Sequence, residues 1–269
     1  MTGKNCLNCD KVLTDKFCAG CGQKADTHRI SFQHFIFHDL LHGTFHIDKG
    51  MLFTARQALT RPGKAALDYI SGKRIRYYNV FYLVLITLGL LLFVRHFYSE
   101  LLISRIGEAV PDPAHQTEAN KALDQIYTQR SKILIFLFVP LSALNSFIVF
   151  RRRRLNLSEH AIIAGMVLLG MLLISMVGHL IYYINLVIPF SEGFATAVDI
   201  SVVVLTMMYV AYAYINAFRA DYSGFAMGCR IALMYLFMCV EVVLLLAFLI
   251  GLVSHWTYQG TFNLNPMGS

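Results

Sequence analysis

The sequence has little charge for its size. Only 14% of its 269 residues are charged, 57% are hydrophobic, and the mean hydropathy is +0.55. A soluble domain is about one quarter charged, so this chain lacks the charge that a soluble surface needs. Proline and glycine are also scarce, at 6 and 18 residues, while 13% of residues are aromatic, which excludes a disordered or fibrous protein. The composition therefore predicts an integral membrane protein.

The first thirty residues contain no apolar run long enough for a signal peptide, so we expect none to be cleaved. Long apolar segments begin only after Asn79. A membrane helix needs about 20 mostly apolar residues, and five segments approach or exceed this length: 80–98, 133–150, 161–188, 194–218 and 229–253. We predict an all-α membrane protein with five transmembrane helices over residues 79–269. A zinc ribbon over 1–28 and an amphipathic juxtamembrane segment over 29–78 would precede them.

The basic residues lie mainly on one side of these spans. Twelve of the 23 Lys and Arg residues precede the first span, four form the run Arg151–Arg154, and Arg219 and Arg230 separate the last two spans. The remaining five fall on the other side. The positive-inside rule then predicts a cytoplasmic N-terminus and an external C-terminus in a bacterial inner membrane. The net charge of +7 suits anionic lipid headgroups, and we do not expect a nucleic-acid partner.

Four cysteines form two C-x-x-C pairs near the N-terminus. Cys6 and Cys9 make the first pair, and Cys18 and Cys21 make the second. Two such pairs place four thiolates around a tetrahedral ion, which suits a structural Zn²⁺. A segment this short cannot build an apolar core, so the metal would supply its folding energy. Disulfides are the alternative, and the predicted cytoplasmic side argues against them. Two further cysteines, Cys229 and Cys239, are expected to be small buried residues of the last span.

A histidine occurs at every fourth position between residues 34 and 46. Residues four apart share one side of a helix, so these histidines and an adjacent acid offer a second metal or proton site: His34, His38, Asp39, His42 and His46. The segment resembles H-E-x-x-H with Asp in place of Glu. A helix at the membrane surface, with histidines at headgroup level, is the simpler interpretation.

Polar residues are rare in the predicted spans and therefore informative. Glu241 falls near the middle of the last span, where a charge is costly, so it should face other helices or carry a proton. Three polar residues lie toward the outer side in other spans, and with Glu241 they could line a cavity: Arg95, His179 and Asp199. Structural pairing between helices is the alternative.

The segment before the first span combines bases with tyrosines. It reads Arg61-Pro62-Gly63-Lys64, followed by Gly72-Lys73-Arg74-Ile75-Arg76-Tyr77-Tyr78-Asn79. Such residues anchor a helix at anionic headgroups, and Lys73, Arg74 and Arg76 would contact lipid or phosphate together with Arg151, Arg152, Arg153 and Arg154.

The ordered motifs from the paired cysteines to Asn79 resemble a bacterial family of uncharacterised zinc-ribbon membrane proteins, known only as a domain of unknown function. The resemblance extends over about residues 5 to 95 and implies the architecture and the bacterial inner membrane. It implies no chemistry. The chain has Val80 where that family is expected to have proline.

Three functions fit these features. The first is a non-enzymatic membrane binding, scaffold or sensory component whose ribbon recruits a cytoplasmic protein. The second is a transporter or permease component that uses Glu241 and the outer polar residues. The third is a metal-dependent membrane enzyme built on the histidines at 34–46.

Overall fold

A computed structural model describes residues 5–27, 49–106 and 131–253. Within these ranges the chain forms seven α-helices and no β-strand, apart from two isolated bridges near the N-terminus. The helices are α2 (Lys49–Thr60), α3 (Pro62–Ile70), α4 (Val80–Ile106), α6 (Ser131–Val149), α7 (Leu157–Asn185), α8 (Glu192–Phe218) and α9 (Gly224–Val253). A short 3₁₀ turn, η4 (Arg219–Asp221), follows α8.

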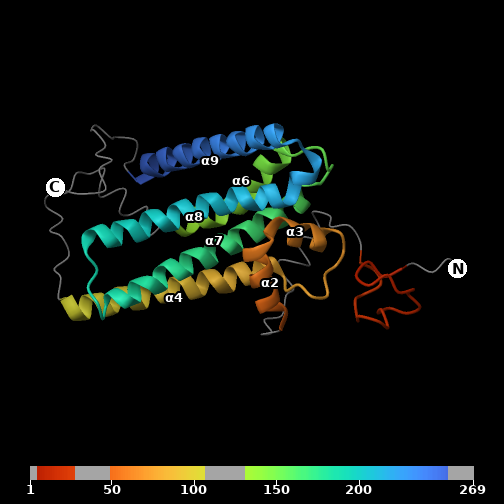
Figure 1. Ribbon diagram of the computed structural model, residues 1–269, viewed down its shortest axis with the longest axis horizontal. Coiled ribbons are helices and arrows are strands. Elements are labelled where there is room, and N and C mark those ends of the chain that lie inside the picture. The colour runs from red at the N-terminus through yellow and green to blue at the C-terminus, as the bar shows by residue number, and fades with distance from the viewer. Residues whose placement is uncertain (1–4, 28–48, 107–130, 254–269) are drawn as a thin grey trace.

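Five helices run side by side along the body, with α2 and α3 at one end and the cysteine-bearing segment beyond them (Figure 1). Helices α4, α7 and α9 run away from that end, and α6 and α8 run toward it (Figure 1). Four of them are long and apolar enough to cross a membrane: Val80–Ser104, Leu157–Asn185, Glu192–Asp221 and Gly224–Leu249. The fifth, α6, has a shorter apolar part, Leu137–Val149.

Helix α7 is the centre of the bundle. In its most apolar stretch 67% of the residues are buried, against 6% in α9, and α7 contacts α2, α3, α4, α6 and α8. Its start is fixed by the sequence, because Asn156 Oδ1 accepts a hydrogen bond from Glu159 N and Glu159 Oε2 accepts one from Asn156 N, both at 2.8 Å. Helix α9 packs mainly on α6, and both of its cysteines, Cys229 and Cys239, are exposed. The expectation that they are buried was wrong, because α9 lies at the edge of the bundle.

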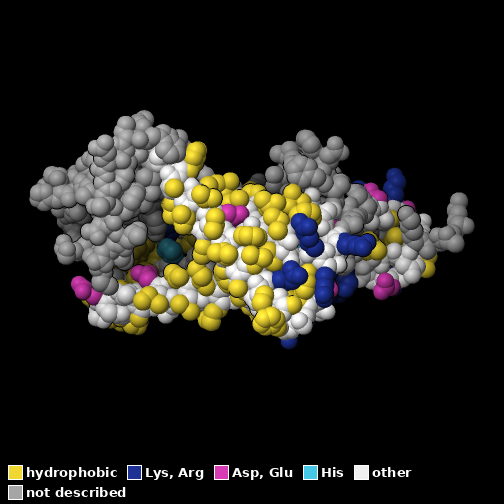
Figure 2. All heavy atoms as spheres, turned by 90° about the horizontal axis from the view of Figure 1, so that it is seen from above, with side chains coloured by type: hydrophobic (Ala, Val, Ile, Leu, Met, Phe, Trp, Pro, Cys, Tyr) yellow, Lys and Arg dark blue, Asp and Glu magenta, His cyan; other side chains and the backbone are white. Residues whose placement is uncertain are grey.

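The surface of the helical body differs from that of the end near α2 and α3. Hydrophobic side chains cover the middle of the body, while Lys and Arg side chains gather toward the end that carries α2, α3 and the cysteines (Figure 2). The large exposed hydrophobic residues include Val203 and Met207 on α8 and Val243 and Phe248 on α9. Such a wide apolar surface is compatible with a lipid bilayer around the long helices.

Candidate metal centre and its docking site

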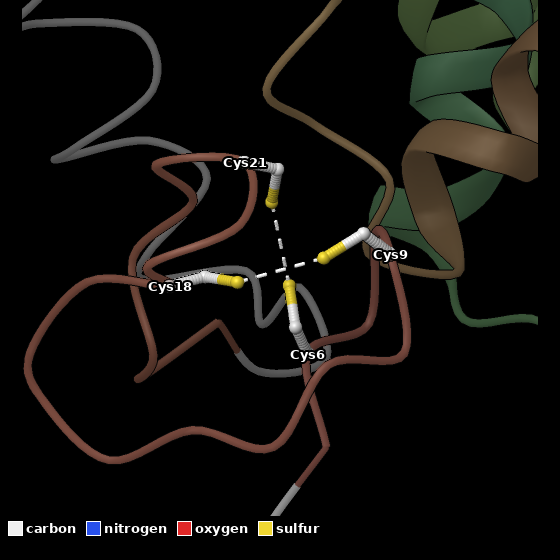
Figure 3. Close-up of side chains that lie close together, drawn as sticks. All are labelled: Cys6, Cys9, Cys18 and Cys21. Atoms are coloured by element: carbon white, nitrogen blue, oxygen red, sulfur yellow. Dashed lines mark hydrogen bonds between the residues drawn. The ribbon is translucent and has the colours of Figure 1, made fainter.

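The four cysteines of the two C-x-x-C pairs converge on one point (Figure 3). Their Sγ atoms all lie within 4.8 Å of one another, and all four thiols are free of disulfides. Cys6 Sγ lies 3.6 Å from Cys21 Sγ, and Cys9 Sγ lies 3.5 Å from Cys18 Sγ. A tetrahedral zinc with Zn–S bonds of about 2.3 Å requires sulfur atoms about 3.8 Å apart. The donor set therefore fits a metal ion of this type.

The two cysteine pairs adopt the same backbone twice, twelve positions apart. Cys6 N donates to Lys11 O at 2.8 Å, and Cys18 N donates to Gln23 O at 2.8 Å. The residue after each pair has a positive φ, 61° at Asp10 and 76° at Gly22, a conformation that glycine and aspartate tolerate best. Each pair thus forms a tight turn that brings its two sulfur atoms to the same side.

The local electrostatics favour thiolates on the second pair. The backbone N–H groups of Gly20 and Cys21 lower the pKa of the Cys18 thiol to about 6. The pKa of Cys9 is instead raised to about 12, because its hydrogen bond from Lys11 N–H is outweighed by burial and by the three neighbouring thiols. Four thiols this close cannot all ionise without a cation, so the cluster has the chemistry of a metal centre.

Gln23 joins this cluster to the rest of the chain. It is 4% exposed, its Nε2 donates to Gly72 O at 2.7 Å, and its Oε1 accepts from Arg74 N at 3.1 Å and Ile75 N at 3.4 Å. Gly72 has φ +102°, and a side chain there would lie 2.6 Å from Leu7 Cδ1. The two turns therefore contact the 72–75 loop through one glutamine and one leucine.

That loop is in turn fixed to α2 and α3. Asp68 of α3 accepts from Lys73 Nζ at 3.3 Å and pairs with Arg61 at 3.4 Å. Tyr77 OH lies 3.5 Å from the same carboxylate, and burial together with Asp68 raises the pKa of this tyrosine. Tyr78 N donates to the buried Thr54 Oγ1 of α2 at 2.8 Å. The loop is a defined connection between the cysteine cluster and the start of α4.

The turn between α2 and α3 is embedded in α8. A Cβ atom on Gly63 would overlap the backbone of Ala213 and Ala217, so glycine is required for this contact. Lys64 N donates to Asn216 Oδ1 at 2.8 Å. Two α8 tyrosines donate to the end of α2, Tyr209 to Ala58 O and Tyr212 to Thr60 O, each at 2.6 Å. The Arg-Pro-Gly-Lys sequence thus serves helix packing.

Three of the four polar residues proposed to line an outer cavity make hydrogen bonds to different groups. Asp199 accepts from Tyr182 OH at 2.7 Å, and His179 Nδ1 lies 2.8 Å from Ser175 O of its own helix. Glu241 Oε2 accepts from Asn145 Nδ2 of α6 at 2.8 Å. Arg95 lies half-buried on α4. These hydrogen bonds fit the structural alternative.

Helix α6 makes two more links of this kind. Ser142 Oγ lies 2.8 Å from Tyr214 OH of α8, and Ser146 Oγ lies 2.7 Å from His160 Nδ1 of α7. With Asn145, the three side chains lie three and four residues apart and so share one side of α6. One turn of α6 therefore joins α7, α8 and α9 by hydrogen bonds.

The arginines expected at headgroups also have protein partners. Lys73 pairs with Asp68, and the Arg74 guanidinium lies over the Tyr69 ring at 5.4 Å. At the same end of the bundle, Arg153 Nε lies 2.7 Å from Asp221 Oδ2 and Arg152 Nη1 donates to Asp221 O at 2.6 Å. Every member of the set is exposed except Arg74, which is half-buried.

The histidine series His34, His38, His42 and His46, with Asp39, lies outside the described residues. Sequence reasoning missed Gln23, Ser142 and Ser146. Gln23 and Lys11 hold equivalent positions, each two residues after a cysteine pair. Lys11 is exposed, whereas Gln23 is buried. The uncharged residue at the second of these positions was the only sign in the sequence that it could be buried.

One family model matches the chain, over residues 48–92, and it is described as a protein of unknown function (DUF3667). The matched segment contains α2, α3, the 72–75 loop and the first half of α4. No curated protein and no solved structure matches. The match therefore falls on the part that joins the cysteine cluster to the bundle.

Proposed function

We propose that the chain is a membrane-anchored binding, scaffold or sensory component, in which residues 1–28 form a structural zinc ribbon. The four-sulfur cluster carries this proposal. Four thiolates complete a tetrahedron, so they leave no open position at which a substrate or water could bind the metal. A closed site of this kind stabilises a fold and presents its surface to a partner. The cysteine spacing and the distances between sulfur atoms support zinc as the ion.

The proposed setting is the inner membrane of a bacterium, crossed five times by α4, α6, α7, α8 and α9. Four of these helices are long enough to cross, and the polar links of α6 to three neighbours support its place as the fifth span. The gathering of Lys and Arg at the end that carries the ribbon supports a cytoplasmic N-terminus and an external C-terminus (Figure 2). Arg76, Arg151 and Arg154, exposed at that end, would contact anionic headgroups.

The ribbon would act on a cytoplasmic protein while remaining attached to the membrane body. Gln23 and Leu7 contact the 72–75 loop, while Val12 and Phe17 are 60% and 58% exposed. A photo-crosslinking amino acid at Phe17, introduced in living cells, should capture one defined protein.

The control is the same crosslinker in a chain that also carries Cys18→Ser, which should capture nothing because the ribbon loses its metal. If crosslinking is absent in the metal-bound protein, or is unchanged by Cys18→Ser, the ribbon does not recruit a partner in the proposed way.

The Glu241–Asn145 hydrogen bond supports a structural role for this carboxyl within the bundle, in place of transport. In the proposed domain division, the juxtamembrane segment is residues 29–78, which include the histidines at 34–46 and lie between ribbon and bundle.

A further inference from the structure

The loop between α6 and α7 packs against the turn between α8 and α9 through arginine side chains. Arg152 N donates to Tyr222 OH at 3.1 Å, and Arg152 Nη1 donates to Asp221 O at 2.6 Å. Arg153 Nε lies 2.7 Å from Asp221 Oδ2. This carboxylate belongs to the one acidic residue in 150–156 and 219–230. The arginine run therefore meets a single negative charge at the α8–α9 turn.

Two further arginines lie at the same turn. The Arg230 guanidinium lies 4.2 Å from the centre of the Tyr222 ring, and the Arg152 guanidinium lies 5.0 Å from the centre of the same ring. A Cβ atom on Gly224 would lie 3.3 Å from Arg219 Nη1, so this guanidinium lies beside the first residue of α9. Together with the arginine paired to the carboxylate, four guanidinium groups gather at one turn.

The positive charges at this turn outnumber the negative charge. Arg153 pairs with Asp221, and within the described residues the other three arginines have no carboxylate partner. Arg230 donates to Val149 O through Nη1, while its buried Nε has no hydrogen-bond partner in the described part of the chain. Guanidinium groups this close repel one another, and an anion between them would remove that repulsion. The turn therefore has the donors and the charge of an anion site.

The donor type favours phosphate as the anion. A guanidinium presents paired, planar N–H donors that match two oxygens of a phosphate. A phosphate offers several charged oxygens and can therefore bind more than one guanidinium, whereas the carboxylate present here pairs with one arginine. Arg219 also lies at the start of α9, the positive end of the helix dipole, where a cation is unfavourable unless an anion accompanies it.

We propose that Arg152, Arg219 and Arg230 form a phosphate-binding site, with the Arg153–Asp221 pair joining its two loops. The site goes beyond the proposed scaffold function, because none of its residues belongs to the ribbon. The phosphate could belong to an anionic lipid headgroup or to a soluble molecule that carries a pyrophosphate group. Only the first source rests on the proposed membrane insertion of the helices.

Native mass spectrometry of the purified full-length protein tests the site, with pyrophosphate and phosphatidylglycerol as separate probes. A site for soluble phosphate should bind one pyrophosphate per chain in detergent without phospholipid. A site for a lipid should retain one phosphatidylglycerol in preference to phosphatidylcholine. In either case Arg219→Gln and Arg230→Gln should each weaken binding about tenfold, the loss of one charge-assisted hydrogen bond. Arg219→Gln should keep the wild-type melting temperature, because Arg219 has no hydrogen-bond or ion-pair partner among the described residues.

Arg76→Gln is the matched control, because Arg76 is also an exposed arginine and lies in the segment before α4, outside the cluster. Its binding of either probe should match wild type. Equal weakening by Arg76→Gln and Arg219→Gln would overturn the site, since it would show general attraction to a basic surface. Failure of wild type to bind either probe would also overturn it. Cys18→Ser should leave phosphate binding unchanged, so a failure of the ribbon proposal remains distinguishable from a failure of this one.

Discussion

Replacing Gln23 by alanine should release the cysteine cluster from the membrane body without removing its metal. The side chain makes three hydrogen bonds to the backbone of residues 72–75 and is 4% exposed. Each net hydrogen bond contributes about 0.5–1.5 kcal/mol, so the loss of all three costs about 1.5–4.5 kcal/mol. The docked state should therefore become about 10 to 2,000 times less favoured relative to the undocked state.

Hydrogen–deuterium exchange of the 72–79 peptide measures this change, because the amides of Arg74 and Ile75 donate to Gln23. Their protection should fall by the same factor as docking. Lys11→Ala is the matched control, since Lys11 occupies the equivalent position of the first cysteine turn and is exposed. Unchanged protection in Gln23→Ala, with metal content equal to wild type, would refute the docking argument.

Three further outcomes follow from the packing and the cluster. Gly63→Val should lower the melting temperature in detergent, because overpacking costs about 1–3 kcal/mol. Gly193→Val is the control and should not, because a Cβ at Gly193 meets open space. Equal melting temperatures of the two variants would contradict the tight α3–α8 contact. In a denaturation assay, Asn145→Ala should destabilise the bundle by about 0.6–2 kcal/mol. Glu241→Gln keeps a hydrogen-bond acceptor for Asn145 and should therefore destabilise it less. The reverse order would contradict a structural role for the Asn145–Glu241 hydrogen bond. Acidification should release the metal, because protons compete for the thiolates, and a chelator should do the same. Metal loss should also lower the protection of the 72–79 amides against hydrogen exchange. If that protection falls while the metal stays bound, docking does not depend on metal binding.

The sequence was sufficient for the parts of the fold that depend on composition and spacing. Long apolar runs predict helices 80–98, 161–188 and 194–218, and α4, α7 and α8 include most of these residues. The two C-x-x-C pairs predict a four-sulfur cluster, since the chemistry resides in the spacing itself. Both are local properties, so they can be read along the chain.

The contacts between helices could not be predicted from the sequence in this way. Serine in an apolar helix carries no sign of its partner, so Ser142 and Ser146 were not singled out, although each bonds a different helix. Nothing in the sequence around Gly63 shows that glycine is required there by the close approach of α8. Cys229 and Cys239 were expected inside the bundle because hydropathy does not distinguish a central helix from one at the edge. These contacts depend on which helices become neighbours.

The central claim is that four cysteine sulfurs bind one metal ion in a cluster docked on the membrane body. X-ray absorption at the zinc edge, on the purified full-length protein, tests it most directly. The account predicts one zinc per chain with four sulfur neighbours at about 2.3 Å. A zinc bound by nitrogen or oxygen ligands, or a metal-free protein with Cys6, Cys9, Cys18 and Cys21 in disulfides, would contradict it.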